Sequence, residues 1–115
     1  MVNGNRKGKV GERELSAKLR ELGFPDSRRG QQFCGRNGDA DIVGIPGVHI
    51  ECKRTQSLNL DRAMEQAIMD SPLTNGNKPA VFHRKNGKSW LVTMRLEDWA
   101  KIYQDSVRKK DDSNL

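Results

Sequence analysis

The sequence predicts an α/β sandwich in which a mixed five-stranded sheet is flanked by helices. Apolar residues recur at helical spacing in three segments, and short strand-like runs bounded by turn residues lie between those segments. The resulting order is helix, three strands, helix, two strands, helix. A chain of 115 residues suits one domain with a single core, so we expect one domain over residues 1–115 with mobile ends at 1–6 and 107–115.

The first helix is predicted over residues 9–22, where Leu15, Leu19 and Leu22 recur at helical spacing and Gly23 supplies a stop signal.

Three strands are expected to follow this helix. The first lies somewhere within residues 27–34, although residues 28–30 are poor strand sequence and also suit a flexible loop. The apolar run at residues 42–45 predicts the second strand. Pro46 and Gly47 then mark a turn, and residues 48–53 predict the third strand.

The second half of the chain continues with a helix over residues 59–70, for which Asn59 is the expected N-cap. Residues 79–84 and 89–94 read as strands joined by the Asn86-Gly87 turn, a strong hairpin signal. The last helix is indicated by the apolar residues Leu96, Trp99, Ala100 and Tyr103. The charged residues from 107 onward predict a mobile tail.

Two carboxylates and one ammonium are expected to meet on the second and third strands. Because side chains alternate along a strand, Glu51 and Lys53 share one face, while Ile50 and Cys52 share the other. A hairpin would bring Asp41 beside this pair. Mg²⁺ is typically held by one or two carboxylates plus substrate phosphate, and a metal-activated water can cleave a phosphodiester.

Other interpretations of these residues stay open. An exposed Glu-x-Lys pair can be a weak surface ion pair. Glu12 lies one turn before Leu15 and could reach under the sheet edge, but it also fits a first-turn acid favoured by the helix dipole. His49 shares the face of Glu51 and could contact the site.

These acidic residues, in this order, resemble the motifs of the PD-(D/E)xK nuclease superfamily. Within it the chain is most similar to the small Holliday junction resolvases of archaea and phages, over roughly residues 7–103. The similar segments are residues 7–13, 19–24, 49–54, 90–94 and 97–99.

The resemblance implies a restriction-endonuclease-like fold and Mg²⁺ as the cofactor, with Mn²⁺ able to substitute. It implies metal ligation by Glu12, Asp41, Glu51 and the main-chain carbonyl of Cys52. It also implies Lys53 as the catalytic lysine and Gln66 as a residue supporting the metal-water network, although Gln66 equally fits a surface position.

The chain departs from the family pattern at two places. Ala40 stands where the signature has proline. The junction resolvases also place a catalytic serine in the loop after the first helix, and the correspondence of Ser27 to that serine is left open.

Charge indicates a polyanionic partner. The net charge is +6, and neutralising phosphates releases counterions. Aromatic residues make up 5% of the chain, which disfavours base stacking on single strands and favours duplex or branched DNA. An ordinary solvated surface is the alternative explanation. The candidate DNA-binding residues are Arg6, Lys7, Arg28, Arg29 and Arg36.

Three functions therefore compete. The preferred one is a Mg²⁺-dependent Holliday junction resolvase of phage type, which acts in DNA recombination as a homodimer because two opposed cuts need two symmetry-related sites. The alternatives are a structure-nonspecific or flap nuclease and a non-catalytic nucleic-acid-binding module. No membrane association is expected, since the sequence has no signal peptide or long apolar run. The expected location is cytoplasmic, in a bacterium or in the host cell of a phage.

Overall fold

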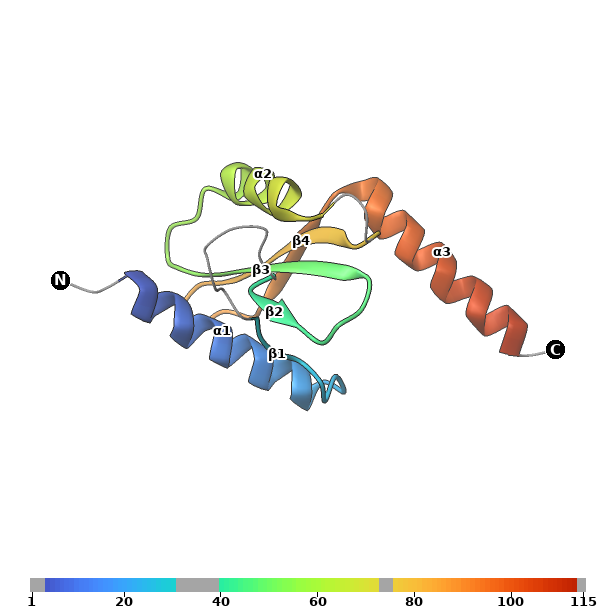
Figure 1. The fold of residues 1–115 in the computed structure, drawn as a ribbon, viewed down its shortest axis with the longest axis horizontal. Helices are drawn as coiled ribbons and strands as arrows, with labels where there is room; N and C mark the ends of the chain where they lie inside the picture. The colour runs from blue at the N-terminus through green and yellow to red at the C-terminus, as the bar shows by residue number, and fades with distance from the viewer. Residues whose placement is uncertain (1–3, 31–39, 73–75, 114–115) are drawn as a thin grey trace.

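The computed structural model describes the backbone of residues 4–30, 40–72 and 76–113, and the side chains of residues 8–30, 40–72 and 76–110 (Figure 1). The predicted order of helices and strands is confirmed. The elements are α1 (Gly4–Glu21), β1 (Arg28–Arg29), β2 (Ile42–Val43), β3 (Val48–Arg54), α2 (Leu60–Asp70), β4 (Lys78–Arg84), β5 (Leu91–Met94) and α3 (Leu96–Ser113).

The five strands form one mixed sheet in the order β1-β2-β3-β4-β5. β3 and β4 run parallel, and the other neighbouring pairs are antiparallel. α1 and α2 lie on opposite sides of the sheet (Figure 1). The predicted class, an α/β fold with a five-stranded mixed sheet flanked by helices, is confirmed. Within the described ranges, no helix has both the length and the apolar character needed to cross a bilayer.

Two small cores fix which face of β3 each side chain occupies. Leu15 and Leu19 of α1 pack with Ile50 of β3 on one side of the sheet. On the other side, Val81 of β4 packs against α2. Glu51 is the register partner of Val81 on the parallel neighbouring strand, so Glu51 shares the α2 face. The alternation predicted for this strand is therefore confirmed.

Both terminal helices are longer than predicted. α1 begins at Gly4 rather than near residue 9. Its first turns contain Gly4 and Gly8, and the low helix propensity of glycine is the reason that the sequence predicted a later start. α3 continues to Ser113, although a mobile tail was predicted from residue 107. Residues 104–113 contain no Gly or Pro, and Gln104, Arg108, Lys109 and Lys110 among them favour helix.

β2 ends at Val43, two residues earlier than predicted, because Gly44 follows with a φ of 95°. A Cβ added at Gly44 would lie 2.0 Å from the carbonyl oxygen of Asp26. The backbone of the segment before β1 thus passes directly over Gly44, and only glycine leaves room for it.

We expect Gly44→Ala to destabilise the protein by about 3 kcal/mol or more, because it adds a backbone clash to an unfavourable φ. Gly47→Ala is the matched control, since Gly47 has a φ of 92° and no atom within 4 Å of an added Cβ. It should show only the smaller conformational cost. Urea unfolding of both variants measures the difference, and equal losses would show that the contact with Asp26 is unimportant.

Candidate metal-dependent active site

The turn between β2 and β3 places Asp41 against the middle of β3. The backbone N–H of Asp41 donates to the carbonyl oxygen of Ile50 at 2.9 Å. Its carboxylate oxygen Oδ2 accepts a hydrogen bond from the backbone N–H of Cys52 at 2.8 Å. These two bonds fix the Asp41 carboxylate beside Glu51, in the position that the hairpin spacing predicted.

Asp41 and Glu51 form a closely spaced acidic pair. Burial, followed by the nearby charge of Glu51, raises the pKa of Asp41 to about 7, against the lowering effect of the hydrogen bond from Cys52. The charge of Glu12 adds to the increase. Because the neighbouring carboxylates disfavour the ionised form of Asp41, a cation placed beside it would be strongly stabilised.

Lys53 lies on the same face of β3, toward α2. Its Nζ donates to Oε1 of Gln66 at 3.4 Å, and Gln66 belongs to α2. This hydrogen bond holds the ammonium against α2, on the face of β3 that also carries Glu51. The structure thus joins the lysine and the glutamine that the resemblance singled out.

Glu12 reaches the site from α1 and is 8% exposed. Its Oε1 accepts a hydrogen bond from Nε of Arg29 at 3.0 Å. Because α1 starts at Gly4, Glu12 is not in the first turn, so the helix-dipole explanation does not apply. Arg29 belongs to the edge strand β1 rather than to a flexible loop, and it neutralises a predicted metal ligand.

His49 is the site residue that the sequence indicated least clearly. Its side chain is 3% exposed, and its Nε2 lies 3.7 Å from Oε1 of Glu51. Within the part of the chain that the structure describes, this Nε2 has no hydrogen-bond partner. An unsatisfied buried polar atom is costly, so its place beside Glu51 suits a role in holding that carboxylate. The signal in the sequence was the two-residue spacing from Glu51.

The opposite face of β3 has a structural role. Nε of Arg54 donates to Glu14 of α1 at 3.2 Å, and Arg84 of β4 contacts the same carboxylate. Cys52 packs against the core on this side, and burial raises the pKa of its thiol above the ordinary range. Cys52 therefore contributes to the site through its main chain.

Several other predicted residues lie away from the site or outside the described residues. Ser27 is 1% exposed, and its hydroxyl donates to the carbonyl oxygen of Ser16 at 2.9 Å, which ties β1 to α1. Arg28 is exposed on β1. Arg36 lies outside the described residues, as do the side chains of Arg6 and Lys7.

The carboxylates at this site are few, but they are enough to hold a hard divalent cation. Among the described residues, no group of three or more His, Cys, Asp and Glu side chains is arranged to hold a metal ion. Glu12 is paired with Arg29, which leaves Asp41 and Glu51 as the adjacent acids. Mg²⁺ is commonly held by one or two carboxylates, with waters and substrate phosphate completing its octahedron.

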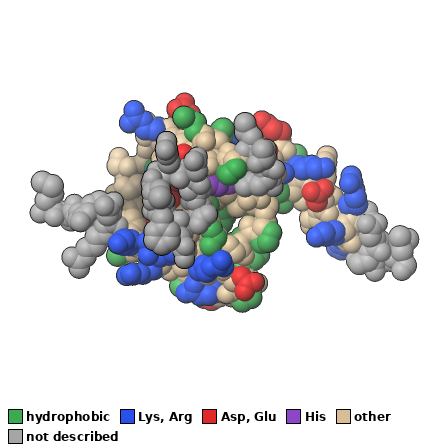
Figure 2. Space-filling model, viewed as in Figure 1, with side chains coloured by type: hydrophobic (Ala, Val, Ile, Leu, Met, Phe, Trp, Pro, Cys, Tyr) green, Lys and Arg blue, Asp and Glu red, His purple; other side chains and the backbone are tan. Residues whose placement is uncertain are grey.

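Basic side chains lie outside this acidic centre. Figure 2 shows Lys and Arg gathered along the lower edge of the molecule, over α1. The exposed basic residues of α1 include Lys9, Arg13, Lys18 and Arg20. Comparison with family models, curated proteins and solved structures gave no significant match. The order of the motifs and the geometry of the site are therefore the features that indicate a function.

Proposed function

We propose that this chain is a Mg²⁺-dependent DNA endonuclease of the PD-(D/E)xK type with a restriction-endonuclease-like fold. The observation that carries the proposal is the position of Asp41 beside Glu51 on adjoining segments, with Lys53 two residues further along the same face. In this arrangement the two acids are adjacent, and the ammonium lies on the same face of β3. An exposed surface ion pair would not require Glu51 to be buried, or Asp41 to be held by the backbone of β3.

Asp41, Glu51 and the main-chain carbonyl of Cys52 would hold the Mg²⁺, and Mn²⁺ could replace it. The bound metal would supply an activated water and polarise the phosphoryl oxygen. Lys53, tethered by Gln66, would offset the negative charge that develops on the phosphate.

Arg29 links DNA binding to the completion of this site. Its guanidinium can pair with Glu12, as in the structure, or with a DNA phosphate. When DNA draws Arg29 away, the carboxylate of Glu12 becomes available as a third metal ligand. Glu12 can therefore act as a metal ligand and Arg29 as a DNA-binding residue in the same complex.

The substrate follows from the resemblance to junction resolvases, so we propose a four-way junction cut by a homodimer during phage-type DNA recombination. A structure-nonspecific or flap nuclease would use the same residues, and a binding module would use only the basic surface. We place the activity in the cytosol, where a free thiol such as that of Cys52 stays reduced.

Cleavage of a labelled four-way junction, a flap and a linear duplex, each with Mg²⁺, Ca²⁺ or EDTA, tests the proposal. We expect Mg²⁺-dependent cutting with preference for the junction, and binding with little cutting in Ca²⁺. Equal cutting of all three DNAs would favour the nonspecific nuclease. Binding without cutting of any DNA in Mg²⁺ or Mn²⁺ would overturn the nuclease proposal and favour the binding module.

Arg28 should contribute to DNA affinity without reading its sequence. Arg28→Ala is expected to weaken binding to every DNA about equally and to reduce the slope of log affinity against log salt by about one. Lys101→Ala, an equal loss of charge on α3, is the control and should leave the slope unchanged. Fluorescence anisotropy in EDTA over a series of salt concentrations provides the measurement. An unchanged slope for Arg28→Ala would remove this arginine from the interface.

A further inference from the structure

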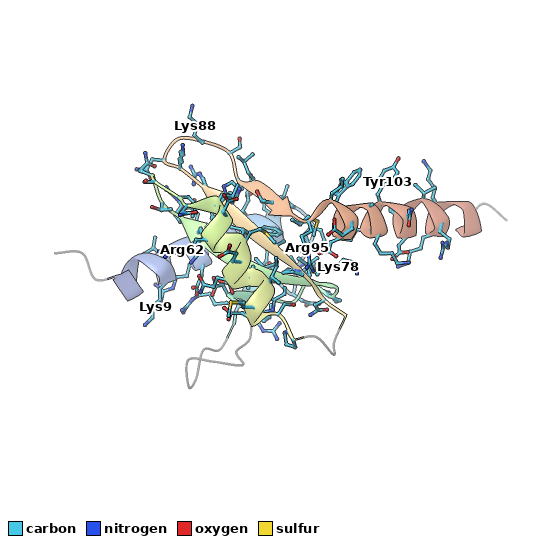
Figure 3. All side chains as sticks on the ribbon, turned by 90° about the horizontal axis from the view of Figure 1, so that it is seen from above. Lys9, Arg62, Lys78, Lys88, Arg95 and Tyr103 are labelled. Carbon is cyan, nitrogen blue, oxygen red and sulfur yellow. The ribbon has the colours of Figure 1, made fainter. Side chains whose placement is uncertain are left out.

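α3 projects away from the body of the protein. Figures 1 and 3 show the helix extending beyond the sheet in two perpendicular views, with Tyr103 labelled on the projecting part. The radius of gyration is 14.9 Å. A compact domain of this length would have a radius of gyration of about 13 Å. The helix has 18 residues and is about 27 Å long, so much of its surface lies outside the core.

The projecting helix carries an exposed apolar stripe. Leu96, Trp99, Tyr103 and Val107 follow one another at intervals of three or four residues, which places them on one side of the helix. Their exposed fractions are 74%, 51%, 57% and 42%, respectively. The rings of Trp99 and Tyr103 stack with centroids 5.5 Å apart.

The apolar stripe of α3 faces away from the body of the protein, so it requires a partner to bury it. A different side of the helix, which includes Ile102 and Asp105, lines an open cleft with Pro46 and Lys78 of the body. The stripe itself faces solvent. Helices of this length are marginal in water unless an amphipathic face is buried by packing.

The charges beside the stripe are self-complementary. The first turn of α3 is acidic, with Glu97 and Asp98, and its second half carries the basic run Arg108, Lys109 and Lys110, which Asp111 and Asp112 follow. Glu97 and Arg108 are eleven residues apart, close to three full turns, so both lie on the same flank of the stripe. Within the described residues, neither has an ion-pair partner in its own chain.

We propose that the stripe is the interface with a second copy of this chain, formed by antiparallel pairing of the two α3 helices about Tyr103. A two-fold axis near Tyr103 places Glu97 of each copy beside Arg108 of the other, and it buries Trp99 against Val107. A nucleic acid would match a uniformly basic face. A helix face with acidic residues at one end and basic residues at the other is complementary to an antiparallel copy of itself.

This pairing stands on α3 alone, so it does not rest on the nuclease assignment. It would link the two copies through their projecting helices, which extend from the end of each body opposite to the start of α1 (Figure 1).

Sedimentation velocity of the full chain over a range of concentrations tests the pairing. Wild-type protein should approach twice the chain mass of 13.0 kDa. Glu97→Arg and Arg108→Glu should each weaken the dimer by about tenfold or more, because each breaks both symmetry-related pairs and creates like-charge contacts. The double reversal should restore association. Glu65→Arg, a charge reversal on α2, is the control and should dimerise normally.

Tyr103→Lys supplies a second variant, because it sets two like charges at the two-fold axis and should leave the protein monomeric. Circular dichroism checks that every variant remains folded. A monomeric wild-type protein would overturn the proposal, as would a double reversal that dimerises no better than the single variants. A Tyr103→Lys variant that is folded and still dimeric would also overturn it.

Discussion

Asp41→Asn is expected to lower Mg²⁺-dependent DNA cleavage by at least about a hundredfold. A metal at a phosphoryl centre supplies several kcal/mol of transition-state stabilisation, and each 1.4 kcal/mol, roughly, is tenfold in rate. The asparagine side chain keeps an oxygen that can accept the hydrogen bond from Cys52, so the local fold should survive. Single-turnover cleavage of a labelled junction provides the measurement.

The melting temperature gives the same variant a second, independent readout. Burial and the charge of Glu51 raise the pKa of Asp41 from 3.8 to about 7, so its cost to folded stability grows as the pH rises through this range and is complete above it. The metal-free variant should therefore melt no lower than wild type. The stabilisation by Mg²⁺ seen in wild type should disappear, because a ligand stabilises only the state that binds it.

Glu65→Gln is the matched control for Asp41→Asn. It neutralises an exposed carboxylate on α2 and should leave both cleavage and the metal-dependent melting shift unchanged. Near-wild-type turnover by Asp41→Asn would show that the assignment of the metal site is wrong.

Lys53→Ala should separate chemistry from metal binding. A charge-stabilising or water-positioning group is worth about 10²–10³ in rate, so turnover should fall by that factor. The melting shift caused by Mg²⁺ should persist or increase, because the acidic pair remains and a neighbouring positive charge is gone. Cleavage rates and thermal melting, measured on the same preparation, test both expectations.

Arg54→Ala is the neighbouring comparison for Lys53→Ala. Arg54 lies on the opposite face of β3 and bonds to Glu14, so its loss should cost about 1–3 kcal/mol of stability and leave turnover of the folded protein largely intact. Equal rate losses at both positions would contradict the division of β3 into a catalytic face and a structural face.

The arrangement of the sheet around the site could be predicted from sequence because its signals are local. Alternation along β3 placed Glu51 and Lys53 on one face, and the Pro46-Gly47 turn brought Asp41 to that strand. Asn59 caps α2 as expected, with its side chain accepting from the backbone N–H of Arg62 at 3.0 Å.

Other features depend on contacts between distant segments, which local patterns do not encode. The pairing of Glu12 with Arg29 requires α1 and β1 to be placed relative to each other. The early end of β2 depends on the approach of Asp26 to Gly44. The burial of His49 depends on the packing of its strand within the sheet. None of these contacts has a periodicity or a turn signal of its own.

The metal site can be located directly by the anomalous scattering of Mn²⁺ in crystals of the protein with DNA. We predict a peak about 2.0–2.2 Å from carboxylate oxygens of Asp41 and Glu51, with the main-chain carbonyl of Cys52 at a similar distance. A protein–DNA crystal in which Mn²⁺ is absent from this position, or binds only elsewhere, would show that Asp41 and Glu51 are not the metal ligands.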